Sequence, residues 1–152
     1  MASSLRLKKV TPKNIDAACG LAVRPKQERF VAPVVRSLAD AYVHRKTAWP
    51  RLIYNGDRLV GFVMANFDPH NPVDAFRCVI WRLTIAATRQ GRGYGRFAVE
   101  AVCAEARRRG QRRVTVTWVS GKHGPEGFYL RLGFRPTGQR LHGEVVGELP
   151  VA

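Results

Sequence analysis

Residues 76–109 decide the fold, because an apolar segment, a glycine-rich loop and an amphipathic segment follow one another without interruption. The three segments read FRCVIWRLTI (76–85), AATRQGRGYGR (86–96) and FAVEAVCAEARRR (97–109). The first is rich in β-branched and aromatic residues and predicts a central strand. In the last, apolar residues recur at spacings of three and four, which predicts a helix from about Gly93 to Arg109.

The glycine-rich loop predicts an anion site. Three glycines in Gln90–Arg96 lack the β-carbons that would keep a ligand away from the backbone. The free N–H groups at the start of the following helix attract an anion, and nearby arginines add positive charge. The loop is no Walker loop, because no Gly-Lys-Ser/Thr follows, and it lacks the third spacing of a dinucleotide fingerprint. A flexible loop is the alternative, but the position between strand and helix favours a pyrophosphate site.

The rest of the chain predicts a mixed α/β sheet with helices on both faces, in a single domain that spans residues 1–152. The hairpin is predicted to turn at Asn55-Gly56-Asp57, with Asn-Gly supplying positive φ angles. Before the central strand we expect strand Leu5–Val10, a helix from Thr11-Pro12 to about Cys19, a helix from Pro33, and a hairpin of Arg51–Tyr54 with Leu59–Ala65. After the central helix we expect strand Arg113–Val119, helix Pro125–Leu132, and strands Phe134–Thr137 and Glu144–Leu149.

The composition narrows the function classes. Lys and Arg number 26 against 11 Asp and Glu, which gives a formal net charge of +15. Such a field attracts polyanions, including nucleic acid or a phosphorylated cofactor. The basic residues are scattered, however, and no basic-aromatic module is present, which favours a solvated basic surface over a nucleic-acid site.

The cysteines and the apolar segments indicate the compartment. Cys19, Cys78 and Cys103 form no close-spaced pair, which favours free thiols in a reducing cytosol over disulfides or a zinc site. No segment approaches the roughly 20 apolar residues of a membrane span, and no secretory signal is recognisable. We therefore expect a cytoplasmic protein with no membrane partner and no metal.

Two motifs resemble the GNAT superfamily of acetyltransferases. Gln90-x-x-Gly93-x-Gly95 matches its Gln/Arg-x-x-Gly-x-Gly/Ala motif, and Phe128–Phe134 (FYLRLGF) matches its aromatic-Tyr-x-x-x-Gly-Phe motif. Trp81–Ile85 is similar to the family's fourth strand, and the strand order fits the whole chain. Segments such as Phe30–Pro33 and Ser37–Tyr42 resemble, more narrowly, the diamine/spermine N-acetyltransferase branch.

The resemblance implies a fold and a set of site residues. The fold is a mixed, mostly antiparallel sheet of about seven strands with about four helices, whose fourth and fifth strands splay apart. Tyr129 would be the general acid that protonates the departing thiolate. The resemblance also implies acetyl-CoA as co-substrate, bound by Leu83, Thr84, Ile85, Gln90, Gly91, Arg92, Gly93, Tyr94, Gly95 and Arg96.

The acceptor and the general base stay open. The resemblance implies a primary amine of a small molecule, while a protein N-terminus or lysine, and a non-catalytic acyl-CoA sensor or nucleic-acid binder, are alternatives. The first two helices, the loop near residues 68–74 and the last two strands would form the acceptor pocket. A homodimer is compatible with the resemblance. Lys122 replaces the Asn that many relatives carry, and the candidate bases are Glu28, Asp40, Asp74 and Glu144.

Overall fold

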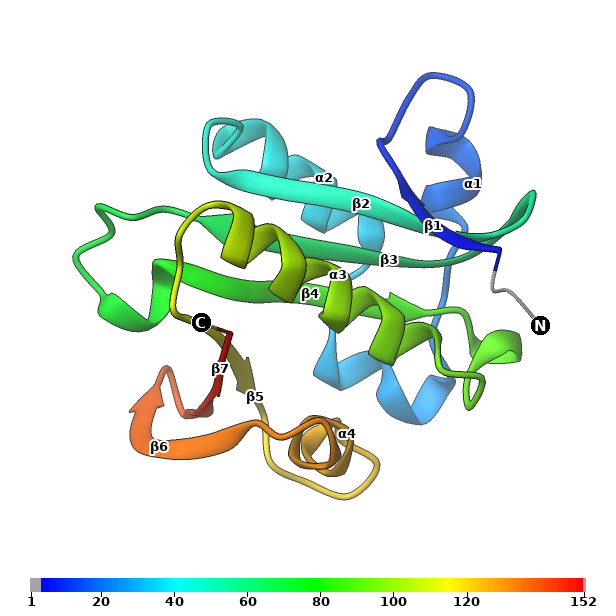
Figure 1. The fold of residues 1–152 in the computed structure, drawn as a ribbon. Helices are drawn as coiled ribbons and strands as arrows, with labels where there is room; N and C mark the ends of the chain where they lie inside the picture. Colours follow the sequence, from blue (N-terminus) through cyan, green and yellow to red (C-terminus); the bar gives the residue numbers. More distant parts are fainter. Residues whose placement is uncertain (1–3, 152) are drawn as a thin grey trace.

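The protein, described over residues 4–151 by a computed structural model, contains a seven-stranded mixed sheet within that range (Figure 1). The strand order is β1-β2-β3-β4-β5-β7-β6, and every neighbouring pair is antiparallel except β4 and β5. The predicted mixed, mostly antiparallel sheet is therefore confirmed. The strands are β1 (Leu5–Lys8), β2 (Ala48–Asn55), β3 (Arg58–Phe67), β4 (Cys78–Ile85), β5 (Arg113–Trp118), β6 (Arg135–Leu141) and β7 (Glu144–Pro150).

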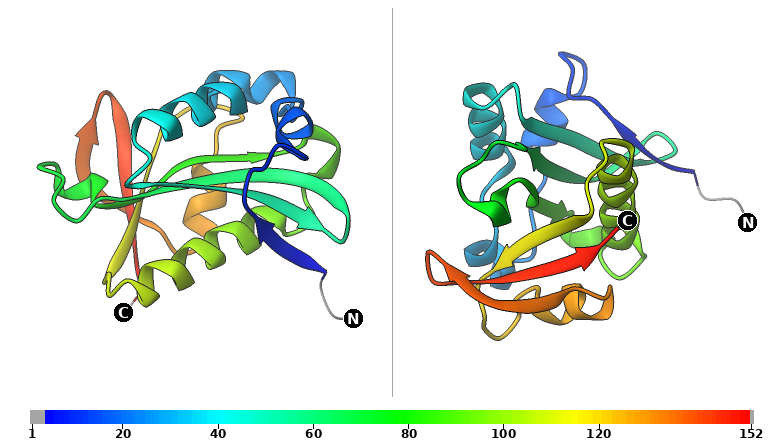
Figure 2. Two further views of the ribbon diagram at one scale, coloured as in Figure 1. Left: turned by 90° about the horizontal axis from the view of Figure 1, so that it is seen from above. Right: turned by 60° about the vertical axis from the view of Figure 1, so that its left-hand side comes forward.

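Helices cover both faces of the sheet. Figure 2 shows α1, η1 and α2 on one face, and α3 and α4 on the other. No helix of the described residues is long and apolar enough to cross a membrane. The α-helices are α1 (Ile15–Cys19), α2 (Val34–Val43), α3 (Tyr94–Arg108) and α4 (Glu126–Arg131), and the 3-10 helices are η1 (Pro25–Phe30), η2 (Asp74–Phe76) and η3 (Ala87–Arg89).

Strand β3 separates two apolar layers. Phe62 and Met64 pack toward α1 and α2, whereas Val63 and Ala65 pack toward α3, and all four are fully buried. A strand buried on both faces reads as a continuous apolar run, which explains why β3 shows no alternation of polar and apolar residues. This rigid centre supports β4, whose far edge forms the site.

The turn between β2 and β3 differs from the predicted Asn-Gly turn. Asn55 pairs with Arg58 in the sheet, so Gly56 and Asp57 form the turn, and of these only Gly56 has a positive φ (60°). A glycine with positive φ at the first turn position is typical of a type II′ hairpin. Asn55 instead donates a hydrogen bond to the Tyr94 hydroxyl (3.0 Å), which ties the hairpin to the start of α3.

The first helix begins later than predicted. Residues 12–14 form a turn in which the Thr11 N–H donates to the Asn14 side chain (2.7 Å), and α1 starts at Ile15. The prediction that Thr11-Pro12 opens this helix is therefore wrong, because Asn14 folds back onto the turn. No sequence pattern predicts η1, since Pro25–Phe30 lacks an apolar period.

One glycine supports the wall of the site. A β-carbon at Gly147 of β7 would overlap the Trp118 ring, whereas one at Gly20 would meet only ordinary contacts of 3.4 Å or more. We expect Gly147→Ala to lower the free energy of unfolding by about 1–3 kcal/mol, because the fully packed indole has no room to move. The matched control Gly20→Ala, at a negative φ, should change it by less than about 1 kcal/mol. Urea denaturation of both variants measures this, and equal effects would contradict the close contact.

Candidate active site

The site lies where β4 and β5 separate. Their parallel pairing consists of two register pairs, Val79 with Thr115 and Ile80 with Val116. At the next residue β4 contains a bulge, because the register with β3 shifts between Met64 and Ala65 and leaves Trp81 without a partner. Bulges re-aim side chains and end strand pairing next to active sites. The predicted splay of the fourth and fifth strands is confirmed.

A cleft of about 1350 Å³ runs through this gap. Leu83 and Ile85 line it, whereas Thr84 is buried (4% exposed) and does not. The glycine loop lies at one end, and the β3–η2 loop and the β6–β7 hairpin lie at the other. The cleft is therefore open to two ligands that meet between the separated strands.

The glycine loop forms a cradle at the start of α3. Gly91 and Gly93 have φ angles of 78° and 84°, and β-carbons on either would meet nothing within 4 Å, so the backbone faces open space. Phe97 donates its N–H to Gly93, which leaves the N–H groups of residues 94–96 without partners inside the helix. Such a helix start fits an anion.

Gly95 has a different role from the other two glycines. Its β-carbon would lie 2.9 Å from the Phe128 ring of α4. The interpretation that all three glycines make room for a ligand is therefore wrong for Gly95, which allows α3 and α4 to pack. Arg96 lines the cleft, whereas Arg92 lines a smaller neighbouring pocket beside the β2–β3 turn.

The Gln90 side chain is fully engaged within the protein. It exchanges two hydrogen bonds with the Gln27 amide of η1 (2.8 and 3.0 Å) and donates a third to the Ile85 carbonyl (3.0 Å). At its other end, η1 reaches the β5–α4 loop, where Arg29 donates to the Lys122 carbonyl (3.3 Å). Segment η1 is thus a strap that joins the cradle to the opposite side of the cleft.

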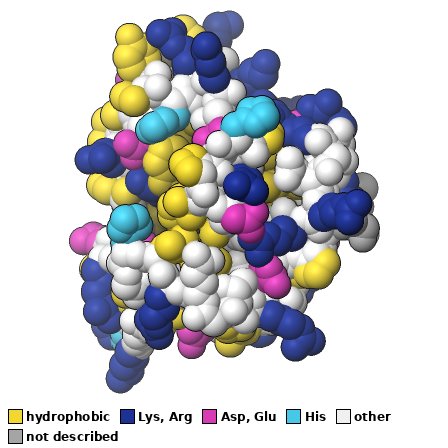
Figure 3. Space-filling view, turned by 90° about the vertical axis from the view of Figure 1, so that its left-hand side faces the viewer, with side chains coloured by type: hydrophobic (Ala, Val, Ile, Leu, Met, Phe, Trp, Pro, Cys, Tyr) yellow, Lys and Arg dark blue, Asp and Glu magenta, His cyan; other side chains and the backbone are white. Residues whose placement is uncertain are grey.

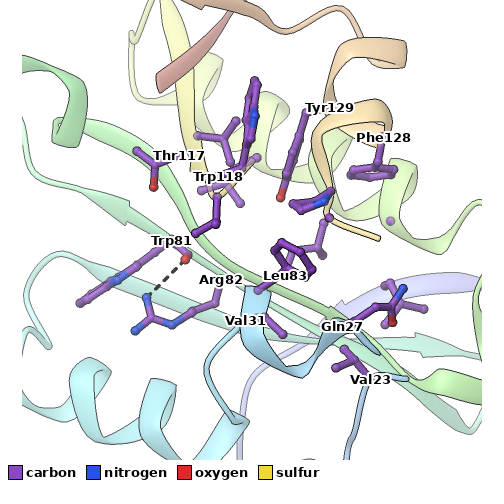
Figure 4. A pocket seen from close by; sticks show the side chains of 18 of the residues that line it. Val23, Gln27, Val31, Trp81, Arg82, Leu83, Thr117, Trp118, Phe128 and Tyr129 are labelled. Atoms are coloured by element: carbon purple, nitrogen blue, oxygen red, sulfur yellow. Dashed lines mark hydrogen bonds between the residues drawn. The ribbon is translucent and has the colours of Figure 1, made fainter. Parts of the chain in front are cut away.

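Tyr129 of α4 directs its hydroxyl into the cleft, above Leu83 (Figure 4). The side chain is 6% exposed, and the hydroxyl has no hydrogen-bond partner among residues 4–151. Its ring stacks on Trp118 (5.7 Å between centroids) and contacts Phe128 and Phe134 edge-on. Burial raises the pKa of Tyr129 above the ordinary value for a phenol, so the hydroxyl keeps its proton.

The structure separates the four candidate bases. Asp40 is shared by Arg36 (3.2 Å) and Arg82 (3.0 Å), and Asp74 is held by two arginines outside the cleft. Glu28 does not line the cleft. Of the four, Glu144 alone lines it, and no ion pair holds its carboxylate in the described part of the chain.

Sequence reasoning expected the loop near residues 68–74 in the acceptor pocket but assigned no individual role to several residues that line the cleft. Asp68 and Asn66 lie at the same end as Glu144, and His44 and His142 also line the cleft. None of these four additional residues belongs to a local motif, so only the folded chain brings them together. No group of three or more His, Cys, Asp or Glu in residues 4–151 could hold a metal ion.

The cysteines lie outside the reaction space. Cys78 and Cys103 are buried in the core between β4 and α3, and neither lines the cleft. Burial raises the pKa of the Cys78 thiol to about 11 and also raises that of Cys103, so both stay protonated at neutral pH. Because a thiolate is the nucleophilic form, this disfavours an acyl-cysteine route.

A splayed sheet with a glycine cradle at the start of its central helix is suited to an extended, anion-bearing ligand between two strands. Residues 14–134 match the model of the acetyltransferase (GNAT) family. The chain therefore belongs to that family, and the prediction of an acetyl-CoA-dependent N-acetyltransferase is confirmed. No curated protein matches the sequence.

Solved structures share the fold. An acetyltransferase from Thermus thermophilus is 24% identical, with a TM-score of 0.69 and 97% of each chain covered. The GNAT domain of S. lividans PAT is 18% identical, with a TM-score of 0.74 over 96% of this chain and 90% of that one. A GNAT acetyltransferase from Elizabethkingia anophelis, solved with acetyl-CoA bound, is 14% identical, with a TM-score of 0.65 over 97% and 98%.

The Gln27–Gln90 pair gives a test of the strap. Double substitution Gln27→Ala/Gln90→Ala should be less destabilising than the sum of the single ones, with a coupling free energy of about 0.5–2 kcal/mol. The reason is that either single change leaves the other amide unpaired. Thermal or urea unfolding of the four proteins measures it. The control cycle combines Gln139→Ala, at an exposed residue of β6, with Gln90→Ala, and there the changes in unfolding free energy should add. Additive changes in both cycles would refute the contact between Gln27 and Gln90.

Proposed function

We propose that the protein transfers an acetyl group from acetyl-CoA to a primary amine of a small molecule, by direct attack in a ternary complex. The observation that carries this is Tyr129, whose ring is buried and whose hydroxyl is unpaired among the described residues and directed into the gap between β4 and β5. A proton donor placed there serves a leaving group that departs inside the cleft.

In this proposal the donor lies along β4 and ends in the cradle. The backbones of Leu83, Thr84 and Ile85 pair with the pantetheine amides, and N–H groups from Gly91 to Arg96 bind the pyrophosphate. The open space beside Gly91 and Gly93 fits such an approach. Gln90 orients the cradle and does not bind the donor through its side chain, because its amide is hydrogen-bonded to Gln27 and Ile85. Tyr94 binds the anion through its backbone N–H.

The transfer forms a nitrogen–carbon bond and breaks the carbon–sulfur bond of the thioester. The neutral amine attacks the carbonyl carbon, the thiolate leaves and takes a proton from Tyr129, and the amide nitrogen loses one proton to water or to a base. Tyr129 then regains its proton from solvent, so protons balance over the cycle. Holding both reactants in one cleft supplies the proximity that the reaction needs.

The remaining assignments rest on the family resemblance. We take residues 1–152 as one N-acetyltransferase domain that works in the cytoplasm, with the acceptor chemistry of the diamine/spermine branch and a homodimer as its expected assembly. A small amine is favoured over a protein N-terminus because the cleft passes under the η1 strap. The absence of a basic-aromatic module argues against nucleic acid as the partner.

The cradle is tested by Gly93→Ala. At a φ of 84° the alanine is strained by about 1–2 kcal/mol, and its methyl group enters the space where the pyrophosphate would lie. We expect the dissociation constant for coenzyme A to rise at least about tenfold, measured by isothermal titration calorimetry. Gly56→Ala places the same strain (φ 60°) in the β2–β3 turn, and should leave coenzyme A affinity unchanged. Equal affinities of the two variants for coenzyme A would show that the cradle does not bind the donor.

The acid is tested by Tyr129→Phe, which keeps the ring stacked on Trp118 and removes only the hydroxyl. We expect kcat to fall about 10²-fold or more, with little change in coenzyme A affinity. The wild-type rate should rise with pH as the amine deprotonates. Because burial raises the pKa of Tyr129, the phenol should stay protonated, and the rate should not fall again, up to pH about 10. Thiol release from acetyl-CoA across an amine panel measures both. The matched control is Tyr42→Phe on the exposed face of α2; an unchanged rate in Tyr129→Phe would exclude the acid role.

A further inference from the structure

A second, smaller pocket lies beside the cradle, on the side of the β2–β3 turn. Its volume is about 650 Å³, and Arg89 and Tyr94 line both this pocket and the cleft. The two spaces therefore meet at the start of α3, which Figure 1 shows at the same end of the sheet as the β2–β3 turn. We term this space the arginine pocket, and it is lined by Asn55, Asp57, Arg58, Arg89, Arg92 and Tyr94.

Hydrogen bonds within the protein hold the walls of the arginine pocket together. Asn55 of the turn donates to the Tyr94 hydroxyl (3.0 Å), and Tyr94 is itself buried (8% exposed). Arg58 pairs with Asn55 in the hairpin, so its backbone is fixed relative to α3. On a third side, the Arg89 N–H of η3 donates to the Ala86 carbonyl (2.8 Å). The arginines thus project from a preformed frame, which lowers the ordering cost of binding a ligand.

Three guanidinium groups share this pocket without a carboxylate of their own. Arg58, Arg89 and Arg92 form no ion pair and no side-chain hydrogen bond within residues 4–151. The one acidic residue among the described residues that line the pocket, Asp57, is exposed and lies 3.9 Å from Arg6. Because like charges that converge without a counterion repel one another, an anion that enters the pocket is stabilised by all three arginines.

The opposite end of the cleft differs, because charges of both signs lie there. Figure 3 shows acidic, histidine and basic side chains around an apolar hollow at that end. Arg82, which lines the cleft, is held by Asp40 (3.0 Å). An anion is therefore favoured at the cradle end, where unpaired arginines converge, over the opposite end.

The chemistry of the donor indicates which anion suits the pocket. In the donor placement proposed above, the pyrophosphate lies at the start of α3, and coenzyme A carries its third phosphate on the adjoining ribose. That phosphate is a monoester with about 1.5 to 2 negative charges at neutral pH. Guanidinium groups match phosphate oxygens with paired hydrogen bonds. Because the arginine pocket adjoins the cradle, it is placed to receive a phosphate that is one ribose away from the pyrophosphate.

We propose that the arginine pocket binds the 3′-phosphate of the donor coenzyme A, and that Arg58 and Arg92 contact this phosphate. The proposal rests on the donor placement in the proposed function. It extends the donor site to the β2–β3 turn, because Arg58 belongs to neither sequence motif. The protein then distinguishes coenzyme A from the form that lacks the 3′-phosphate.

The experiment compares coenzyme A with 3′-dephospho-coenzyme A, which differ only in this phosphate. Isothermal titration calorimetry gives the dissociation constants of both ligands for wild type, Arg58→Gln, Arg92→Gln and the double variant. The matched control is Arg112→Gln, at an exposed arginine before β5 that lines neither pocket. Thermal unfolding of each variant checks that the fold is intact.

We expect wild type to bind coenzyme A at least about tenfold more tightly than the dephospho form, because the dephospho form lacks the charged hydrogen bonds of the phosphate. The difference should shrink as the ionic strength rises. Arg58→Gln and Arg92→Gln should each weaken coenzyme A binding by about three- to tenfold and leave binding of the dephospho form unchanged. The double variant should bind both ligands equally, whereas Arg112→Gln should keep the wild-type difference.

Four results would overturn the proposal. Equal binding of both ligands by wild type excludes the 3′-phosphate from the pocket, while the cradle is judged independently by Gly93→Ala. A wild-type difference that survives in the double variant means that the phosphate binds elsewhere. An equal loss for both ligands in Arg58→Gln and Arg92→Gln assigns these side chains to the pyrophosphate. Binding of neither ligand by wild type overturns the proposed function together with this extension of it.

Discussion

The early end of the pairing between β4 and β5 is the constraint on which the site depends. Parallel strands that pair over two register positions and then diverge leave the edge of β4 without a strand partner from Trp81 to Ile85. Backbone polar groups removed from water need hydrogen-bond partners. Gln90 supplies one, at the Ile85 carbonyl, and the others face the cleft. The fold thus creates an extended, ladder-like binding edge that suits a long ligand with amide groups.

The position and the protonation state of Tyr129 have one physical origin. Its ring is stacked on Trp118, whose indole nitrogen donates to Glu126 (2.7 Å) and whose six-membered ring packs closely against Gly147. This packing removes the phenol from water, and the same desolvation raises its pKa. The hydroxyl is therefore fixed by apolar contacts alone, which leaves its hydrogen-bonding capacity for a ligand.

The local parts of the structure could be predicted from the sequence, and the parts made by distant contacts could not. The central strand β4, α3 and the glycine-rich loop follow from residue composition, periodicity and glycine spacing within residues 76–109. The reciprocal bonds of Gln27 and Gln90 join residues 63 positions apart, and no period marks η1. Asp68 and Glu144 likewise line one cleft only because the fold brings the end of β3 and the start of β7 to it. Gly95 fits the motif, yet its contact with Phe128 decides its role.

The charged side chains are arranged differently at the two ends of the cleft. A net charge of +15 favours the approach of a polyanionic donor and opposes that of a polycation. The cradle is suited to the first effect, since a helix start and Arg96 meet there. Farther along β4, Asp40 holds the guanidinium of Arg82 on the face covered by α2. Arg36 shares the same carboxylate (3.2 Å), and Glu144 also raises the pKa of Arg82. Because a partly buried ion pair gains little over its desolvation cost, the Arg82–Asp40 pair contributes mainly by holding this guanidinium against α2.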